Sequence, residues 1–221
     1  MLSTSQSLAN LALSSPIASR VLRRHRLDFC CHGGRSLAEA CQERGLDADT
    51  VLGEIAAAPA TDVQTDFRQL PISALIEHIV TNFHEAHRRE LPALVELARK
   101  VERVHADKAT VPVGLAAHLL EMHQAMELHM QKEEQVLFPM IIRGTGSRAQ
   151  APVRQMELEH DEHGEKLRQL RRICRDFVAP EEACTSWRAL YLRCEQLEAD
   201  LMAHIHLENH VLFPRALNAG V

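Results

Sequence analysis

The sequence predicts an all-α protein, a C-terminal up-down-up-down four-helix bundle preceded by a small helical N-terminal domain. Hydrophobic residues make up 46% of the 221 residues, whereas aromatic residues make up only 4%. The apolar residues are mostly Leu, Ala, Val and Met, which pack helices better than sheets, because strands draw on β-branched and aromatic side chains. The nine Gly and nine Pro cluster at a few places, so long uninterrupted helices fit between them.

We expect three segments along the chain. Residues 1–58 form the small domain, residues 59–70 form a polar, Pro-containing linker, and residues 71–221 form the bundle. Ser15-Pro16 begins the small domain's clearest helix, because Ser is a good N-cap and Pro is tolerated in the first turn. The short helical stretches expected in this domain are 16–26, 36–44 and 47–57.

Four long helical patterns make up the bundle. The breaks between them fall near residues 107–110, 144–147 and 179–180. Because the connections are short, consecutive helices should be antiparallel neighbours. The prolines at 71, 112 and 152 lie near expected helix starts, and those at 92, 139 and 214 should kink or end their helices.

Charge, apolar runs and cysteine content argue against a nucleic-acid-binding, membrane-spanning or disulfide-rich secreted protein. The formal net charge of −5 argues against a nucleic-acid partner, and the basic stretches 20–26 and 166–175 read as solvated helix faces. No apolar run approaches the roughly 20 residues that span a bilayer, so we expect no membrane partner. The sequence begins without a signal-peptide pattern. The six Cys lack the spacing of a disulfide framework, which favours a reduced, cytoplasmic protein.

Histidine is unusually abundant, with 14 residues, and an internal repeat explains part of this excess. His129-x-x-x-Glu133 and His204-x-x-x-Glu208 are each followed by Val-Leu-Phe-Pro, and the two copies lie 75 residues apart. Apolar residues at steps of three and four precede both histidines, so His and Glu replace apolar residues on the buried stripe of two helices. No other acid is expected on this stripe.

Two buried glutamates, each one helical turn from a histidine, need a cation. A His and a Glu at i and i+4 point the same way from a helix. A buried carboxylate is very costly unless it is paired or bound to a metal. The repeat therefore predicts that Glu133 and Glu208 bind metal together with His129 and His204.

The first and third bundle helices supply further donors. His84-Glu-Ala-His87 and His160-Asp-Glu-His163 share a pattern with an offset of 76 residues. Spacing alone does not choose between the two histidines of either pair. Four imidazoles and two carboxylates exceed what one tetrahedral site requires, and mixed nitrogen and oxygen ligands suit iron or manganese. A ferritin-type site needs two Glu-x-x-His motifs among its ligands; Glu157 begins one, whereas the one at Glu102 ends at His105, which lies off the ligand pattern.

The motifs together resemble the Repair of Iron Centers (RIC) family, whose bundle is hemerythrin-like. The bundle carries the pattern of His and His-x-x-x-Glu positions just described, with Phe-Pro after each glutamate. Two further segments narrow the resemblance from hemerythrin-like proteins in general to the RIC family. They are residues 28–34, with the sequence Asp-Phe-Cys-Cys-His-Gly-Gly, and residues 101–107. The resemblance covers nearly the whole chain, including the small domain.

The resemblance implies a non-haem di-iron protein with an oxo or hydroxo bridge when oxidised. It selects His84 and His160 over His87 and His163, and makes the two glutamates the bridging ligands. The implied metal ligands are His84, His129, Glu133, His160, His204 and Glu208. No role follows for His87, His105 or His163.

The implied function is repair of iron-sulfur clusters damaged by nitrosative or oxidative stress. The clients would be damaged iron-sulfur proteins, and the small molecules would be nitric oxide or oxygen. The thiols of Cys30 and Cys31 would handle iron or nitric oxide, and we expect the basic residues 20–26 to favour the thiolate. The remaining cysteines (41, 174, 184 and 194) read as core residues.

Iron delivery and nitric oxide reduction both fit the sequence, so whether the protein is an enzyme stays open. An oxygen or nitric oxide binding or sensing module and a nitric oxide reductase are the alternative functions. The Cys-Cys domain argues against a simple oxygen carrier, which has no evident use for it.

Overall fold

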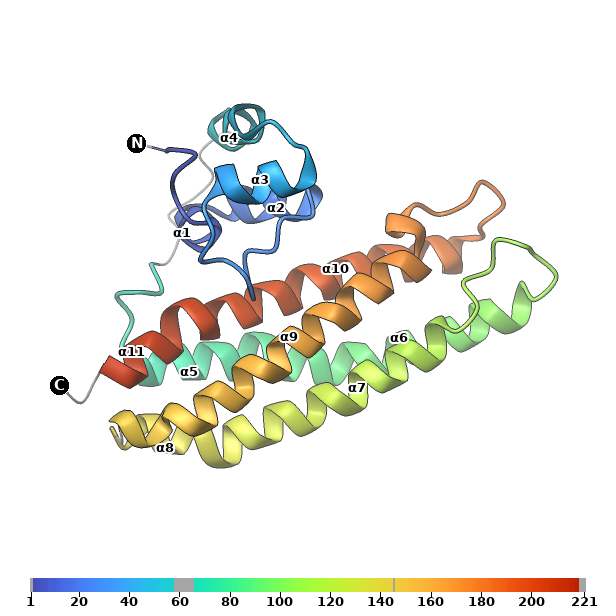
Figure 1. The fold of residues 1–221 in the computed structure, drawn as a ribbon. Helices are drawn as coiled ribbons and strands as arrows, with labels where there is room; N and C mark the ends of the chain where they lie inside the picture. The colour runs from blue at the N-terminus through green and yellow to red at the C-terminus, as the bar shows by residue number, and fades with distance from the viewer. Residues whose placement is uncertain (1, 58–65, 145, 219–221) are drawn as a thin grey trace.

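The computed structural model describes residues 2–57, 66–144 and 146–218, which are helices joined by loops (Figure 1). No strand occurs among these residues, although Ser7 and Ser36 form an isolated β-bridge. The all-α prediction is therefore confirmed. None of the described helices is both long and apolar enough to cross a membrane.

The N-terminal domain contains one helix more than the sequence predicts. Its helices are α1 (Leu8–Ser14), α2 (Pro16–Arg24), α3 (Leu37–Arg44) and α4 (Ala48–Ala56). Ser15 caps α2 as expected, and its hydroxyl accepts the Ile17 amide at 3.1 Å. The unexpected helix α1 is capped by Ser7, whose hydroxyl accepts from Asn10 N at 3.2 Å. Seven residues were too few for a clear helical period.

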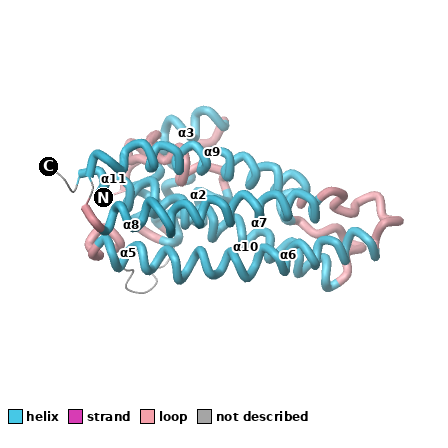
Figure 2. The backbone as a smooth tube through the Cα atoms, turned by 90° about the horizontal axis from the view of Figure 1, so that it is seen from below, coloured by secondary structure: helices cyan, strands magenta, loops and turns pink. Residues whose placement is uncertain are grey.

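The bundle consists of four helical rods that run alongside one another (Figure 2). Three of the rods are interrupted by a short π-helical turn, and α9 is continuous. The rods are α5 (Ile72–Ile79), η1 (Val80–His84) and α6 (Glu85–Val104); α7 (Leu115–Lys132), η2 (Glu133–Leu137) and α8 (Phe138–Ile142); α9 (Gln150–Ile173); and α10 (Thr185–Leu207), η5 (Glu208–Leu212) and α11 (Phe213–Asn218). Short 3₁₀ turns, η3 (Gly146–Ala149) and η4 (Arg175–Phe177), flank α9.

Each rod contacts the next one in the chain, and the last contacts the first. Thus α6 lies against α7 and α10, and α9 lies against α7 and α10. This arrangement is the predicted up-down-up-down bundle. The helix α6 continues through Pro92, so the proline does not end it, whereas Pro139 and Pro214 each fall in the first turn of a new helix after a π turn.

The core consists of two apolar clusters. One joins the N-terminal domain, through residues such as Leu22 and Phe29, to the half of the bundle nearer the α6–α7 loop. The other surrounds Ile79, Phe138 and Phe213 near the chain's C-terminal end. The bundle histidines and glutamates of the sequence motifs lie between these clusters along each rod.

The first part of the expected linker, through residue 65, lies outside the described residues. Its described end packs on the bundle: Arg215 donates to the carbonyl oxygens of Phe67 at 3.2 Å and Leu70 at 2.6 Å.

Candidate metal centre

All four rods contribute side chains to one buried polar layer. The six residues that the resemblance selects as ligands are each no more than 1% exposed: His84, His129, Glu133, His160, His204 and Glu208. Residues separated by up to 124 positions in the chain thus meet in one buried site. The fold brings together every one of the six.

The six side chains form two groups that share both glutamates. One group is His84, Glu133, His204 and Glu208, and the other is His129, Glu133, His160 and Glu208. In each group the candidate ligand atoms lie within 4.8 Å of one another. The arrangement can therefore hold two cations side by side.

Each carboxylate turns one oxygen toward each group. Glu133 Oε2 lies 3.4 Å from His84 Nε2, and its Oε1 lies 3.4 Å from His129 Nε2. Glu208 Oε1 lies 3.2 Å from His204 Nε2, and its Oε2 lies 3.1 Å from His160 Nε2. A carboxylate oriented in this way can bridge two metal ions.

The polar atoms of the layer fit a pair of bound cations. All four oxygens of Glu133 and Glu208 are buried and have no hydrogen-bond partner among the described residues. The imidazole nitrogens face one another as well, with His84 Nε2 at 3.1 Å from His204 Nε2 and the corresponding His129–His160 distance also 3.1 Å. Buried carboxylates and convergent ring nitrogens without other partners are the donor set of a nitrogen and oxygen metal site.

The electrostatics of the layer also favour charged carboxylates. Burial would raise the pKa of Glu208, but the imidazoles of His204 and His160 outweigh it and hold the pKa well below its usual range. Burial would lower the pKa of His129, but the carboxylates of Glu133 and Glu159 outweigh it and raise the pKa to about 10. Ionised carboxylates are the form that binds a metal, and metal binding would displace the proton of His129.

Three π turns position the candidate ligands, and the sequence analysis did not predict these turns. Two of the turns begin at a glutamate, Glu133 or Glu208, and the third ends at His84. Each turn is closed by a hydrogen bond from the N–H of residue i+5 to the carbonyl oxygen of residue i. Such turns occur often at functional sites. For the two turns that begin at a glutamate, the signal in the sequence was the proline six residues further on, because proline lacks the N–H that would continue the α-helical hydrogen bonds.

Three of the four candidate ligand histidines are oriented by a partner outside the layer. His84 Nδ1 lies 2.7 Å from Glu134 Oε1, and His129 Nδ1 lies 3.0 Å from Glu159 Oε2. His160 Nδ1 lies 2.7 Å from the side-chain oxygen of Asn209. These partners fix the ring tautomer that points Nε2 inward. For His204 Nδ1 there is no such partner in the part of the chain that the structure describes.

His87 and His163, left open by the sequence, lie beside the layer and outside both groups. The ring centroids are 5.4 Å apart for His87 and His204, and 5.0 Å apart for His163 and His129. Burial lowers the pKa of His163 to about 2 and places that of His87 well below its usual value, so both rings are neutral. Their Nε2 atoms are buried without a partner among the residues described.

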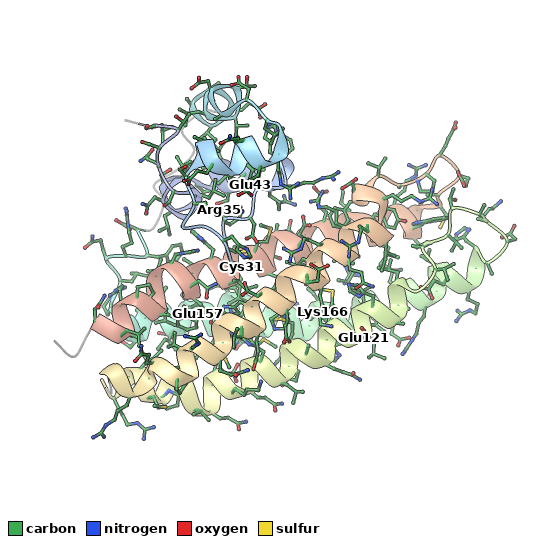
Figure 3. The ribbon with its side chains drawn as sticks, in the orientation of Figure 1. Cys31, Arg35, Glu43, Glu121, Glu157 and Lys166 are labelled. Carbon is green, nitrogen blue, oxygen red and sulfur yellow. The ribbon has the colours of Figure 1, made fainter. Side chains whose placement is uncertain are left out.

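Figure 3 shows Cys31 where the loop that carries Cys30 and Cys31 meets the bundle, and the contact is with His160. The Cys31 thiol donates to the carbonyl oxygen of His160 at 3.4 Å, and Asn209 Nδ2 donates to the Cys30 carbonyl at 3.0 Å. A Cβ atom on Gly164 would lie 3.3 Å from Cys31 Sγ, so a side chain at this position would crowd the thiol. Asn209 therefore connects the thiol loop to a candidate metal ligand.

The environment of the thiols differs from the sequence-based expectation. The Cys30 and Cys31 sulfurs are 3.7 Å apart, and Asp28 accepts from both backbone amides. The hydrogen bond with Cys31, burial and the negative charge of Asp28 raise the pKa of Cys30. The prediction that basic residues 20–26 favour a thiolate was wrong for Cys30, because an acid and not a base is its charged neighbour. Asp28, Cys30 and Cys31 nevertheless form a third group able to hold a metal.

Two further sequence-based interpretations were wrong. Glu198 is a buried acid on α10 that sequence reasoning missed, and Arg171 holds it with two hydrogen bonds. Cys184 is exposed, not part of the core, and its sulfur lies 3.1 Å from His105 Nε2. In both cases the partner is distant in sequence, so helical periodicity could not reveal it.

Comparisons with known proteins agree with this organisation. Residues 75–216 match the family model described as "Hemerythrin HHE cation binding domain", and residues 4–59 match ScdA_N, described as "Domain of Unknown function (DUF542)". The chain is 47% identical over 212 residues to the "Iron-sulfur cluster repair protein YtfE" of Escherichia coli O1:K1 and of Escherichia fergusonii. The same protein of Escherichia coli O81 is 46% identical, and each alignment covers 96% of both chains. With both domains matched and such relatives along nearly its full length, the chain belongs to the RIC family of iron-sulfur cluster repair proteins.

Proposed function

We propose that the protein holds two non-haem iron ions in the buried layer and uses them in the repair of damaged iron-sulfur clusters. The observation that carries the proposal is the pair of ligand groups that share Glu133 and Glu208. The proposed ligands are His84, His129, Glu133, His160, His204 and Glu208. Four imidazoles and two carboxylates suit iron, whereas a zinc site would need fewer ligands.

The repair function comes from the relatives. Proteins named for iron-sulfur cluster repair share 47% identity with 96% of this chain, and the similarity includes the thiol-bearing domain. Proteins with damaged iron-sulfur clusters are then the clients. Bound iron would supply a redox change and binding positions for a small molecule such as nitric oxide.

The protein's own residues would keep the metal and control access to it. Glu134 and Glu159 hold ligand imidazoles, and are themselves paired with Arg88 at 2.8 Å and Lys132 at 2.6 Å. Movement of either cation would loosen the glutamate that it pairs with, and with it the imidazole that this glutamate holds. The apolar clusters above and below the layer exclude bulk water.

The thiol loop favours a transfer role over simple gas binding. An oxygen or nitric oxide binding or sensing module needs only the bundle, and so does a nitric oxide reductase. Here Cys31 contacts the backbone of His160, and Asn209 links that ligand to Cys30. This contact gives iron or nitric oxide a short path between the thiols and the bundle. We therefore propose Cys30 and Cys31 as the residues that handle iron or nitric oxide.

A reconstitution experiment tests the function. The iron-loaded protein is incubated with a [4Fe-4S] hydratase that nitric oxide has inactivated, and the recovery of hydratase activity is followed together with the loss of iron from the donor. The metal-free protein is the control. Recovery with iron transfer supports delivery, whereas catalytic consumption of nitric oxide without transfer supports the reductase alternative. No recovery beyond that of the metal-free protein would exclude repair by this chain.

A further inference from the structure

An arginine-lined cleft lies between the N-terminal domain and the bundle. Its volume is about 510 Å³, which is within the range of small-molecule sites. Seven arginines from both domains line it: Arg23, Arg26, Arg44, Arg168, Arg171, Arg172 and Arg175. Most belong to the basic stretches 20–26 and 166–175, which the sequence suggested were solvated helix faces. The two stretches instead meet across one cleft.

Acidic side chains neutralise only part of this charge. Asp28, Asp176 and Glu198 also line the cleft, and each is within ion-pair distance of at least one of the arginines. Two further acids outside the lining, Glu165 and Glu195, pair with lining arginines. The hydrogen bond from Thr110 and the charges of Lys108 and Arg175 lower the pKa of Glu182, which is a sixth acid near the cleft. Seven cations thus face six acids when every partner is counted, so the cleft keeps a positive charge.

Arg44 and Arg175 are the two lining arginines without an ion-pair partner in the described chain. Arg44 ends α3 in the N-terminal domain, and Arg175 follows α9 in the bundle. The unpaired charges therefore come from opposite sides of the cleft. An anion with two negative groups could contact both domains at once.

The backbone around the cleft is strained, which supports a functional reading. The described non-glycine residues with positive φ are Arg26 (57°), Arg175 (48°), Asp176 (58°) and Phe177 (63°). Three of the four line the cleft, and the Phe177 ring lies 4.7 Å from the Arg171 guanidinium carbon. The Arg26–Asp176 ion pair, at 2.7 Å, joins the strained positions of the two domains. Such conformations cost free energy and cluster at binding sites.

We propose that this cleft binds a small multivalent oxyanion, a molecule with two or more carboxylate or phosphate groups, between the two domains. Guanidinium groups match both oxyanions through paired hydrogen bonds. Because Cys30 is part of the same wall, the anion would lie beside the thiol loop. The inference goes beyond the proposed iron chemistry: the cleft shares Asp28 and Cys30 with the thiol loop, but none of the six proposed ligands of the di-iron layer lines it.

Calorimetry on the full-length, iron-loaded protein tests this inference. Tricarballylate and fructose 1,6-bisphosphate serve as the carboxylate and phosphate probes, because both chelate iron weakly, and acetate serves as the monovalent control. We expect at least one probe to bind, with acetate much weaker, and the affinity to fall as salt is raised. The probe that binds more tightly identifies the oxyanion class.

Matched variants locate the bound anion. Arg44→Gln and Arg175→Gln should each weaken binding by about fivefold to tenfold, because each removes one charged hydrogen-bond donor. Arg99→Gln, on the exposed face of α6 and outside the cleft, should leave binding unchanged. Iron content measured after each titration separates binding from loss of metal. Failure of both multivalent probes to bind, or equal binding by the cleft and control variants, would overturn the proposal.

Discussion

Substitution of two buried glutamates ten residues apart should have different effects on iron binding. Glu208 lies in the candidate metal layer, and Glu198 lies on the preceding helix α10, where Arg171 holds it. We expect Glu208→Leu to lose at least one iron and Glu198→Leu to keep both irons. Both substitutions should destabilise the metal-free bundle.

The structure sets the size of both effects. His160 Nε2 and His204 Nε2 lie 3.1 Å and 3.2 Å from the two Glu208 oxygens, and they hold the pKa of this buried carboxyl well below its usual range, so the charged carboxylate stabilises the metal-free fold. Its removal leaves the buried imidazoles without their counter-charge, so we expect the metal-free Glu208→Leu variant to lose about 3–5 kcal/mol. Glu198 accepts from Arg171 Nε at 2.8 Å, and its removal leaves that cation half-buried. We expect a loss of about 2–4 kcal/mol, because Asp176 remains near Arg171 at 3.5 Å.

Iron analysis and urea unfolding of the metal-free variants measure these effects. Iron content per chain should fall below two for Glu208→Leu alone, whereas the urea midpoint should fall for both variants. Two irons retained in Glu208→Leu would refute the bridging role. A metal-free Glu208→Leu variant more stable than the metal-free wild type would refute the reasoning that the imidazoles stabilise the buried carboxylate.

Three further predictions concern the contact between the thiol loop and the bundle. Cys30→Ala with Cys31→Ala should keep both irons yet lose most repair activity in the reconstitution assay; iron lost with the thiols, or full activity without them, would contradict a transfer role. Burial lowers the pKa of His206 from 6.5 to about 3. Between these two pH values, His206 is protonated in the unfolded chain and neutral in the folded chain. The free energy of unfolding therefore decreases as the pH is lowered. In urea titrations, the His206→Gln variant should lose about 2 kcal/mol less than the wild type between pH 7 and pH 5. Equal losses in the two proteins would contradict this role of His206. Asn209→Leu removes the side-chain oxygen that accepts from His160 and the amide that donates to the Cys30 carbonyl. The affinity for iron, measured by chelator competition, should therefore fall about 10–100-fold, and Cys31 should be alkylated faster. Unchanged iron affinity and alkylation rate would show that Asn209 does not connect the thiol loop to the metal layer.

The bundle and the candidate ligands could be predicted because both follow from the spacing of residues that are close in the sequence. A polar residue at a core position is visible against an apolar stripe, and the repeat at 75 residues doubled the signal for His129-x-x-x-Glu133. The choice of His84 over His87 was not local. Both are buried, and only the packing of neighbouring rods decides which ring nitrogen faces Glu133.

The supporting contacts of the layer could not be predicted in the same way. Glu134, Glu159 and Asn209 are each adjacent in sequence to a proposed ligand, but each binds the histidine of a different rod. A helical wheel places these residues toward the edge of the buried face, where an acid or amide usually meets water. Their role depends on how the rods are rotated about their axes, which the π turns change.

The two basic stretches show the same limit at the scale of domains. Each is an ordinary charged helix face when considered alone, and Arg172 and Arg24 are indeed solvated, with 64% of each side chain exposed. Arg23 and Arg171, by contrast, are only 18% and 17% exposed, and both reach Glu198 from opposite sides of the interface. A sequence read one segment at a time assigns each charge to solvent. Only the docking of the N-terminal domain on α9 and α10 turns two unremarkable stretches into one positively charged cleft beside the thiols.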